Sequence, residues 1–226
     1  MYQVEKNVFI NKETNEVIKI DLKSHVLKEC EYILNLPDSD FYYKVASFSK
    51  LSFNLEDYMS KKDVISNLNF AEENNEELYE LHIQLVKGET IDKILSKYNL
   101  KVKGIKNQVI SFDLFIQYLS AILDLFFKVR DLNSKLFFHN DLNYDNIIYE
   151  NDRFVLIDFG ESTIIKPDCI EGESDEDAIL IIIHSLFKVG LKNNEVIKLI
   201  KEFDIDNIEI KDIPLLYQKM NNFLNN

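Results

Sequence analysis

The chain is poor in the residues that break or cross-link a fold. It has 226 residues, with only 5 glycines, 3 prolines and 2 cysteines, and no tryptophan. So little glycine and proline argues against a loop-rich or disordered chain, because such chains are enriched in both. Apolar residues make up 46% of the sequence. That share predicts a real hydrophobic core, in one compact domain or two small lobes.

The two cysteines, Cys30 and Cys169, have no metal-type spacing. They are also too few for the disulfide framework of a chain meant for an oxidising compartment. The N-terminal stretch "MYQVEKNVFI" has neither the basic flank nor the apolar core of a secretory signal. We therefore expect two reduced thiols in a cytoplasmic protein.

Basic residues are outnumbered by acidic ones, 26 against 39, which gives a formal net charge of −13. This balance argues against nucleic acid or an anionic membrane surface as the main partner. The most apolar run, "AILIIIHSLF" at 178–187, has about half the length needed to span a bilayer. We expect it to be a buried helix and predict no membrane span.

The hydrophobic pattern changes along the chain from strand-like to helical. The first part combines strands at 7–10, 16–20, 41–48 and 79–86 with helices at 25–36 and 55–68, and we place the acidic run 71–77 in a solvated loop. The later part predicts a hairpin within 146–158 and helices at 90–98, 111–133, 175–189, 193–203 and 213–224. This order predicts an α+β fold with a small β-rich lobe at 1–86 and a larger helical lobe at 87–226.

The most informative stretch is "FFHNDLNYDNIIYENDRFVLIDFGES" at 137–162. Transfer of a phosphoryl group from a nucleotide needs metal ions, a cation on the donor phosphates and a carboxylate that positions the acceptor hydroxyl. Mg²⁺ prefers oxygen ligands, which Asn146 and Asp158 carry. A hairpin between them can fold the chain back and bring them together. Gly160 would permit a tight turn directly after Asp158.

These residues resemble the catalytic core of the protein-kinase-like superfamily. The matching pattern is His-x-Asp-Leu-x-x-x-x-Asn followed by Asp-Phe-Gly, formed here by His139, Asp141, Leu142, Asn146 and Asp158–Gly160. The resemblance implies a two-lobed kinase-like fold with a truncated helical lobe, a catalytic hairpin at 137–160, and ATP and Mg²⁺ as cofactors. It also implies that Asp141 is the catalytic base, that Asn146 and Asp158 hold Mg²⁺, and that His139 packs the loop.

The same resemblance requires a strand lysine that holds the phosphates and pairs with a helix glutamate. Lys19, flanked by apolar residues in "EVIKI", is the candidate lysine. Glu29 is its candidate partner, because the apolar positions three, four and seven residues after it would pack on the sheet. Glu31 is the competing choice.

Two further positions follow from the resemblance. The end of the strand at 79–86 would be the hinge, where the Gln84 carbonyl and the Val86 amide face adenine and Ile83 backs the pocket. An aspartate should also stand at the start of the apolar helix after a short activation segment. Asp177 is the first choice for it, and Asp175 is the alternative.

The sequence departs from the family at four places. The first glycine is Gly88, so no glycine-rich loop covers the phosphates. Asn140 replaces an arginine that meets a phosphorylated activation loop, and Asn143 replaces the lysine of Ser/Thr protein kinases. The segment 161–177 is short and lacks the Ala-Pro-Glu element, and only about fifty residues follow it.

Three functions are therefore open. The first is an ATP- and Mg²⁺-dependent Ser/Thr protein kinase of minimal size. The second is a kinase for a small-molecule hydroxyl, of the aminoglycoside, choline or sugar type, which the missing lysine and short segment favour. The third is a pseudokinase that binds a protein partner.

Overall fold

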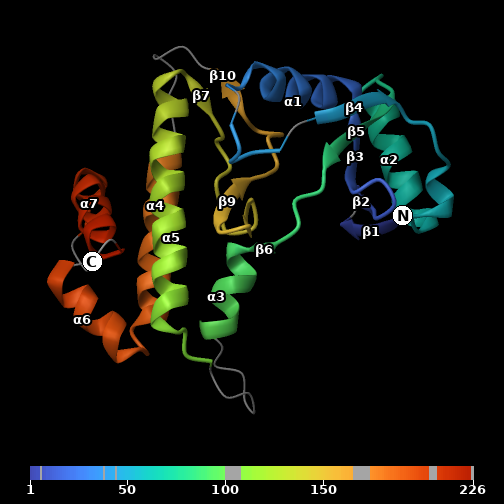
Figure 1. Cartoon of the computed structure of the whole chain (residues 1–226). Helices are drawn as coiled ribbons and strands as arrows, with labels where there is room; N and C mark the ends of the chain where they lie inside the picture. Colours follow the sequence, from blue (N-terminus) through green and yellow to red (C-terminus); the bar gives the residue numbers. More distant parts are fainter. Residues whose placement is uncertain are drawn as a thin grey trace. The chain divides into compact units, whose positions relative to one another are not determined.

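The computed structural model (Figure 1) describes residues 1–5, 7–37, 39–43, 45–99, 108–164, 174–203 and 208–224, and the fold is mixed α+β. The chain forms two compact units. The first contains Met1–Val86 and Asp158–Ser162, and the second contains Lys87–Ile157 and Thr163–Asn226. The Asp-Phe-Gly motif thus belongs to the first unit, although most of the residues around it in the sequence belong to the second.

The first unit is built on a five-stranded antiparallel sheet with the order β1-β2-β3-β5-β4. Its strands are β1 (Tyr2–Glu5), β2 (Val8–Asn11), β3 (Glu16–Leu22), β4 (Val45–Lys50) and β5 (Leu78–Gln84). The polar turn between β2 and β3 ends at Asn15, which has a φ of 57°, a left-handed conformation that asparagine tolerates better than most residues. β3 lies inside the sheet between β2 and β5.

The side chains of β3 alternate between the two faces of the sheet. Ile18, Ile20 and Leu22 are buried in a core cluster that also includes residues of the 3₁₀ helix η1 (Leu55–Asp57) and of α2 (Lys61–Glu73). Lys19 therefore faces the opposite side, which α1 (Lys23–Asn35) covers through contacts with β3, β4 and β5. Each face of the sheet has one helix packed on it.

Three expectations about the first unit need correction. The predicted strand at 41–48 begins only at Val45, because the preceding aromatic residues 41–43 are buried outside the ladder. The predicted helix at 55–68 is two elements, because Ser60 accepts the amide of Asp63 and starts a separate helix there. The acidic run was placed in a loop, but residues 71–73 belong to α2, where Ala71 is buried.

The second unit is organised around α4 (Phe112–Ser134), whose buried residues recur on one side of the helix. α4 packs along α5 (Asp175–Gly190), and the two run side by side in Figure 1. The other helical elements of this unit in the described ranges are α3 (Ile91–Asn99), α6 (Asn194–Phe203), η4 (Ile210–Asp212) and α7 (Ile213–Leu224). Both long helices were predicted, since their apolar periodicity extends over several turns.

Two small sheets complete the second unit. One pairs β6 (Glu89–Thr90), β8 (Ile147–Glu150) and β9 (Arg153–Leu156), and the other pairs β7 (Phe137–Phe138) with β10 (Thr163–Ile164). The β8–β9 hairpin turns through Asn151 and Asp152, whose φ angles of 50° and 62° fit a two-residue turn of the primed type. This hairpin connects Asn146 to Ile157, the last residue of the first segment of the second unit. None of the helices in the described ranges is long and apolar enough to cross a bilayer.

Candidate functional site

Lys19 forms two short salt bridges within the first unit. Its Nζ lies 2.8 Å from Glu29 Oε2 and 2.7 Å from Asp158 Oδ1. The side chain of Glu29 is 5% exposed, whereas that of Asp158 is 48% exposed. We call Lys19, Glu29, Tyr43, Asp158 and Phe159 the lysine cluster. Within it, Lys19 contacts Glu29, 10 positions away in the sequence, and Asp158, 139 positions away.

The helix geometry of α1 explains why Glu29, and not Glu31, meets Lys19. Val26, Glu29, Cys30 and Ile33 are buried, which is the spacing of one helix face turned toward the sheet. Glu31 is exposed. Burial also raises the pKa of the Cys30 thiol to about 11, with the charge of Glu29 adding to the effect. Cys30 is therefore a protonated core thiol, and Cys169 lies outside the described residues.

The two carboxylates determine the charge of Lys19. Burial by itself would lower the pKa of this ammonium, but the negative charges of Glu29 and Asp158 outweigh it and raise the pKa above the ordinary lysine value. Lys19 is therefore a fixed cation at neutral pH. A fixed cation beside a half-exposed carboxylate can hold an anionic group such as a phosphate.

The phenylalanine of the Asp-Phe-Gly motif fastens this segment to the first unit. Phe159 is 1% exposed. Its ring stacks on Tyr32 at 5.7 Å and meets the edges of Tyr42 and Tyr43 at 6.2 and 5.7 Å. Aromatic contacts of this kind add stability beyond burial alone. They anchor Asp158 in the first unit.

A hydrogen-bonded turn follows Asp158: the amide of Ser162 donates to the carbonyl of Phe159 at 3.1 Å, and Gly160 is the second residue of this turn. Asp158 has a φ of 61°, in the left-handed region. A Cβ added at Gly160 would meet its nearest neighbour, Asp158 Oδ1, at 3.5 Å, an ordinary contact distance. The predicted tight turn at Gly160 is therefore present, but the left-handed residue of the motif is Asp158.

The second unit holds the other motif residues in what we call the loop cluster, residues 139–146 with Asp175. Asn146 Nδ2 donates to Asp141 Oδ2 and to the Asp141 carbonyl, both at 2.9 Å. Asn143 Nδ2 donates to Asp141 Oδ1 at 3.1 Å, and its own side-chain oxygen accepts the amides of Asp145 and Asn146. The exposed Asp141 carboxylate is thus oriented by two side-chain amides.

Asp175 anchors the loop cluster from the start of α5. It is 5% exposed, and its two oxygens accept the amides of His139 at 2.8 Å and Asn140 at 3.0 Å. Asp177, the first choice for this position, instead forms a capping box with Ser174. That choice was wrong, because the aspartate that reaches the loop is the first residue of α5 and not the third.

His139 and Asn140 have structural contacts within the second unit. His139 is 3% exposed, and its Nε2 lies 3.0 Å from the carbonyl of Ile157, so it donates a hydrogen bond there. Asn140 has a φ of 64°, and its Nδ2 donates to Thr163 Oγ1 at 2.8 Å. Asparagine tolerates this left-handed conformation well. The residue that replaces arginine therefore links the loop to β10.

The predicted hinge residues lie at the end of the first unit. Ile83 is buried inside β5, Gln84 is the exposed last residue of that strand, and Val86 is the last residue of the first segment of the unit. The amide of Leu85 donates to the carbonyl of Asn15 at 2.9 Å. The structure therefore gives Gln84 and Val86 positions on an extended strand end, and their role toward adenine stays a prediction.

The residues predicted to bind a metal fit a magnesium ion in their donor atoms. Because the Asn146 nitrogen donates to Asp141, the amide oxygen is the atom that can face a cation. Asp158 adds a half-exposed carboxylate, and both are the oxygen donors that Mg²⁺ prefers. No group of three or more histidine, cysteine or acidic side chains suited to a metal occurs among the described residues. Asn146 belongs to the second unit and Asp158 to the first, and a shared role of the two residues in holding Mg²⁺ stays a prediction.

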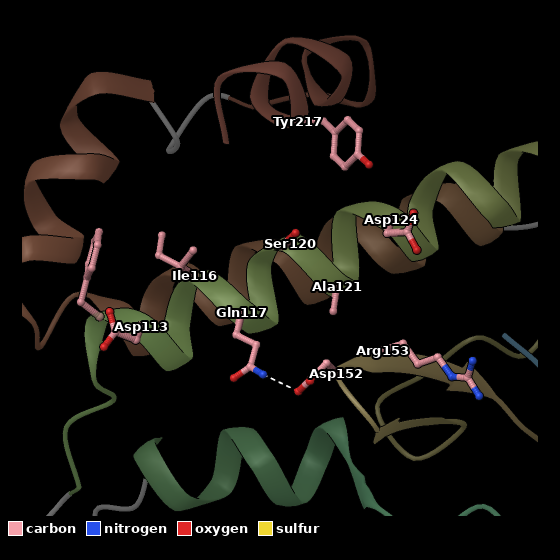
Figure 2. A pocket seen from close by; sticks show the side chains of 10 residues that line it. Asp113, Ile116, Gln117, Ser120, Ala121, Asp124, Asp152, Arg153 and Tyr217 are labelled. Carbon is pink, nitrogen blue, oxygen red and sulfur yellow. Dashed lines mark hydrogen bonds between the residues drawn. The ribbon is translucent and has the colours of Figure 1, made fainter. Parts of the chain in front are cut away.

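A separate hollow of about 550 Å³ lies in the second unit, where α4 faces α7 and the β8–β9 hairpin (Figure 2). Asp113, Asp124 and Asp152 are among its lining residues. Gln117 donates a hydrogen bond to Asp152, and Lys128 pairs with Asp124 at 3.0 Å. Its lining in the described ranges contains no residue of the loop cluster, so we distinguish this hollow from the candidate site.

No protein-family model matches the chain, and no curated protein is similar to it at a significant level. The functional assignment therefore depends on the residues and contacts described above.

Several site residues were not found from the sequence. Tyr43 stands in an aromatic run that was interpreted as a strand, and Asn140 and Asn143 were noted only for the residues they replace. Asn143 did carry a usable signal, because asparagine often accepts the amides of the residues that follow it in a tight turn. Tyr43 carried none, since the amide that its hydroxyl accepts belongs to Asp158, 115 residues further along the chain.

Proposed function

We propose that this chain is an ATP- and Mg²⁺-dependent phosphotransferase of the protein-kinase-like superfamily, with a protein serine or threonine hydroxyl as the first candidate acceptor. The observation that carries the proposal is the contact of Lys19 with both Glu29 and Asp158. The sequence alone predicts a role for each of these three residues. The contacts among these three residues support a site for nucleotide phosphates, because a chance match to the motif would not be expected to bring them together.

Each residue has one role in the proposed reaction. Lys19 holds the donor phosphates, and Glu29 fixes the lysine. Asn146 and Asp158 would hold Mg²⁺, which neutralises phosphate charge when bound. The acceptor oxygen forms a bond to the γ-phosphorus, the bond from phosphorus to the leaving ADP oxygen breaks, and the acceptor proton passes to Asp141. The two amides that orient Asp141 support its role as the base.

Two other functions keep specific support. A small-molecule hydroxyl is the second candidate acceptor, because Asn143 occupies the position of the phosphate-neutralising lysine and bonds to Asp141 instead. A regulatory binding module is the candidate of a different class. It is supported by the connection between β1 and β2, which contains no glycine to approach the phosphates closely.

A thermal melt with and without ATP and Mg²⁺ separates the enzyme from the binding module. A ligand at a hundred times its Kd stabilises the folded state by about 2.7 kcal/mol. For a chain of this size, that corresponds to a rise in Tm of roughly 5–10 °C. We expect such a rise for the native chain and a much smaller one for Asp158→Asn. An unchanged Tm at millimolar ATP would contradict the phosphotransferase proposal.

The acceptor class requires a transfer experiment. Incubation of the chain and γ-labelled ATP with a lysate, followed by separation of proteins from small molecules, shows which fraction gains the label. We expect label in the protein fraction, and none in either fraction with Asp141→Ala or Lys19→Ala. Label confined to small molecules would select the second candidate acceptor.

A further inference from the structure

The hydroxyl of Tyr43 lies against the backbone of the Asp-Phe-Gly segment. Tyr43 stands between α1 and β4 in the first unit and is 6% exposed. Its oxygen accepts the backbone amide of Asp158 at 3.0 Å, and its ring meets the edge of Phe159 at 5.7 Å. One side chain thus holds both the backbone of Asp158 and the ring of Phe159.

The same hydroxyl also reaches the glutamate that pairs with Lys19. It donates to Glu29 Oε1 at 3.5 Å, and this oxygen accepts the amide of Phe159 at 3.3 Å. Burial raises the pKa of Tyr43 well above 10, with the negative charge of Glu29 adding to the effect. The hydroxyl therefore stays protonated and can donate to Glu29 while it accepts from Asp158. Two successive amides of the motif are held by Tyr43 and Glu29.

These bonds occur where the backbone is strained. Asp158 has a φ of 61°, a region that residues other than glycine occupy at an energetic disadvantage. Such a conformation persists when the surroundings fix it through several contacts. Here the contacts are the hydroxyl of Tyr43 on the Asp158 amide and the salt bridge from Asp158 Oδ1 to Lys19 at 2.7 Å.

We propose that Tyr43 is a positioning residue, whose hydroxyl holds Asp158 in the left-handed conformation that presents its carboxylate to Lys19. The effect on nucleotide binding rests on the proposed function. If Asp158 shares a magnesium ion with the phosphates, a loosened Asp158 binds Mg·ATP less tightly. The effect on the backbone does not rest on it, and can be measured in the ligand-free chain.

Hydrogen exchange in the ligand-free protein tests the backbone effect. Tyr43→Phe keeps the ring on Phe159 and removes only the hydroxyl. Tyr42→Phe is the matched control, because it removes a hydroxyl from a neighbouring ring that also meets Phe159 edge-on. We expect the amides of Asp158 and Phe159 to exchange about tenfold faster in Tyr43→Phe, as for the loss of one buried hydrogen bond. Equal exchange in the native chain and Tyr43→Phe, or the same acceleration in both variants, would overturn the proposal.

Binding of Mg·ATP, measured from the thermal melt, tests the effect on the nucleotide. We expect the Kd to rise about tenfold in Tyr43→Phe and to change less than about twofold in Tyr42→Phe. A native chain that does not respond to Mg·ATP refutes the proposed function, and the exchange result then decides the role of Tyr43 alone. A native chain that binds Mg·ATP no better than Tyr43→Phe refutes the link between Tyr43 and the nucleotide.

Discussion

Lys19 is the residue on which the charge balance of the first unit depends. Its ammonium compensates the buried carboxylate of Glu29, and removal of one partner of such a pair leaves an uncompensated buried charge. We expect Lys19→Met to lower the free energy of unfolding by about 2–3 kcal/mol. This estimate lies below the range for fully buried pairs, because Lys19 is 20% exposed and Asp158 is half exposed.

The alkaline side of a pH–stability profile tests the same pair. Because the folded-state pKa of Lys19 is raised above 10.5, its stabilisation is complete below that pH and is lost as the pH rises through the raised value. Urea unfolding of the native chain should show this alkaline loss, and Lys19→Met should lack it. Lys61→Met, at an exposed position on α2, is the control and should change stability by less than about 0.5 kcal/mol. Equal effects of the two substitutions would contradict the assignment.

The pairing of Lys19 with a helix glutamate was predicted from the resemblance of the motif residues, and the apolar face of the next helix favoured Glu29 over Glu31. The sequence did not predict Tyr43, since the position of that hydroxyl depends on contacts with Glu29 and Asp158 that no local pattern encodes. The left-handed φ of Asp158 was also missed, because Gly160, two residues further on, was the more permissive residue for a turn.

At the scale of elements, two acidic residues at the start of α5 have different roles. Asp175 accepts the backbone amides of His139 and Asn140 in the loop cluster, whereas Asp177 caps its own helix through Ser174. Burial raises the pKa of Asp175, and the amides of His139 and Asn140 only partly oppose that shift. The two hydrogen bonds from the loop are therefore the contacts that favour the carboxylate form of Asp175 against the effect of burial.

We expect the two aspartates to differ clearly on replacement. Asp175→Ala leaves the buried amide of His139 and the partly buried amide of Asn140 without this acceptor, and should lower the free energy of unfolding by about 2–4 kcal/mol. Asp177→Ala removes one half of a capping box and should lower it by about 1 kcal/mol. Urea denaturation of both variants measures the difference. A larger loss for Asp177→Ala would refute the anchoring role of Asp175.

The helices and most strands followed from hydrophobic periodicity, but the register at the start of α5 did not. Three acidic residues stand in a row there, and the first residue of a helix is uncertain by one or two positions in any pattern. A shift of two positions moves an aspartate from the loop cluster to the helix cap. The alternative choice, Asp175, is the first residue of the helix and the one that contacts the loop.

At the scale of the whole molecule, the acidic excess controls behaviour in solution. The formal charge of −13 keeps copies apart at neutral pH, and the isoelectric point is about 4.8. We expect a solubility minimum near that pH, because the mutual repulsion disappears there. Light scattering across a pH series at low ionic strength measures it. Scattering that stays constant from neutral pH down through the isoelectric point would contradict the expectation.

The division of the chain has a consequence for its synthesis. The polypeptide passes between the units after Val86, after Ile157 and after Ser162, so the first unit is completed by a five-residue segment that is made late. On a ribosome, the N-terminal sheet can form early. Until the late segment emerges, however, the tyrosine rings that contact Phe159 lack this partner, and Lys19 lacks the carboxylate of Asp158. Nascent chains arrested before Asp158 should therefore carry an incomplete first unit that is easier to unfold by force.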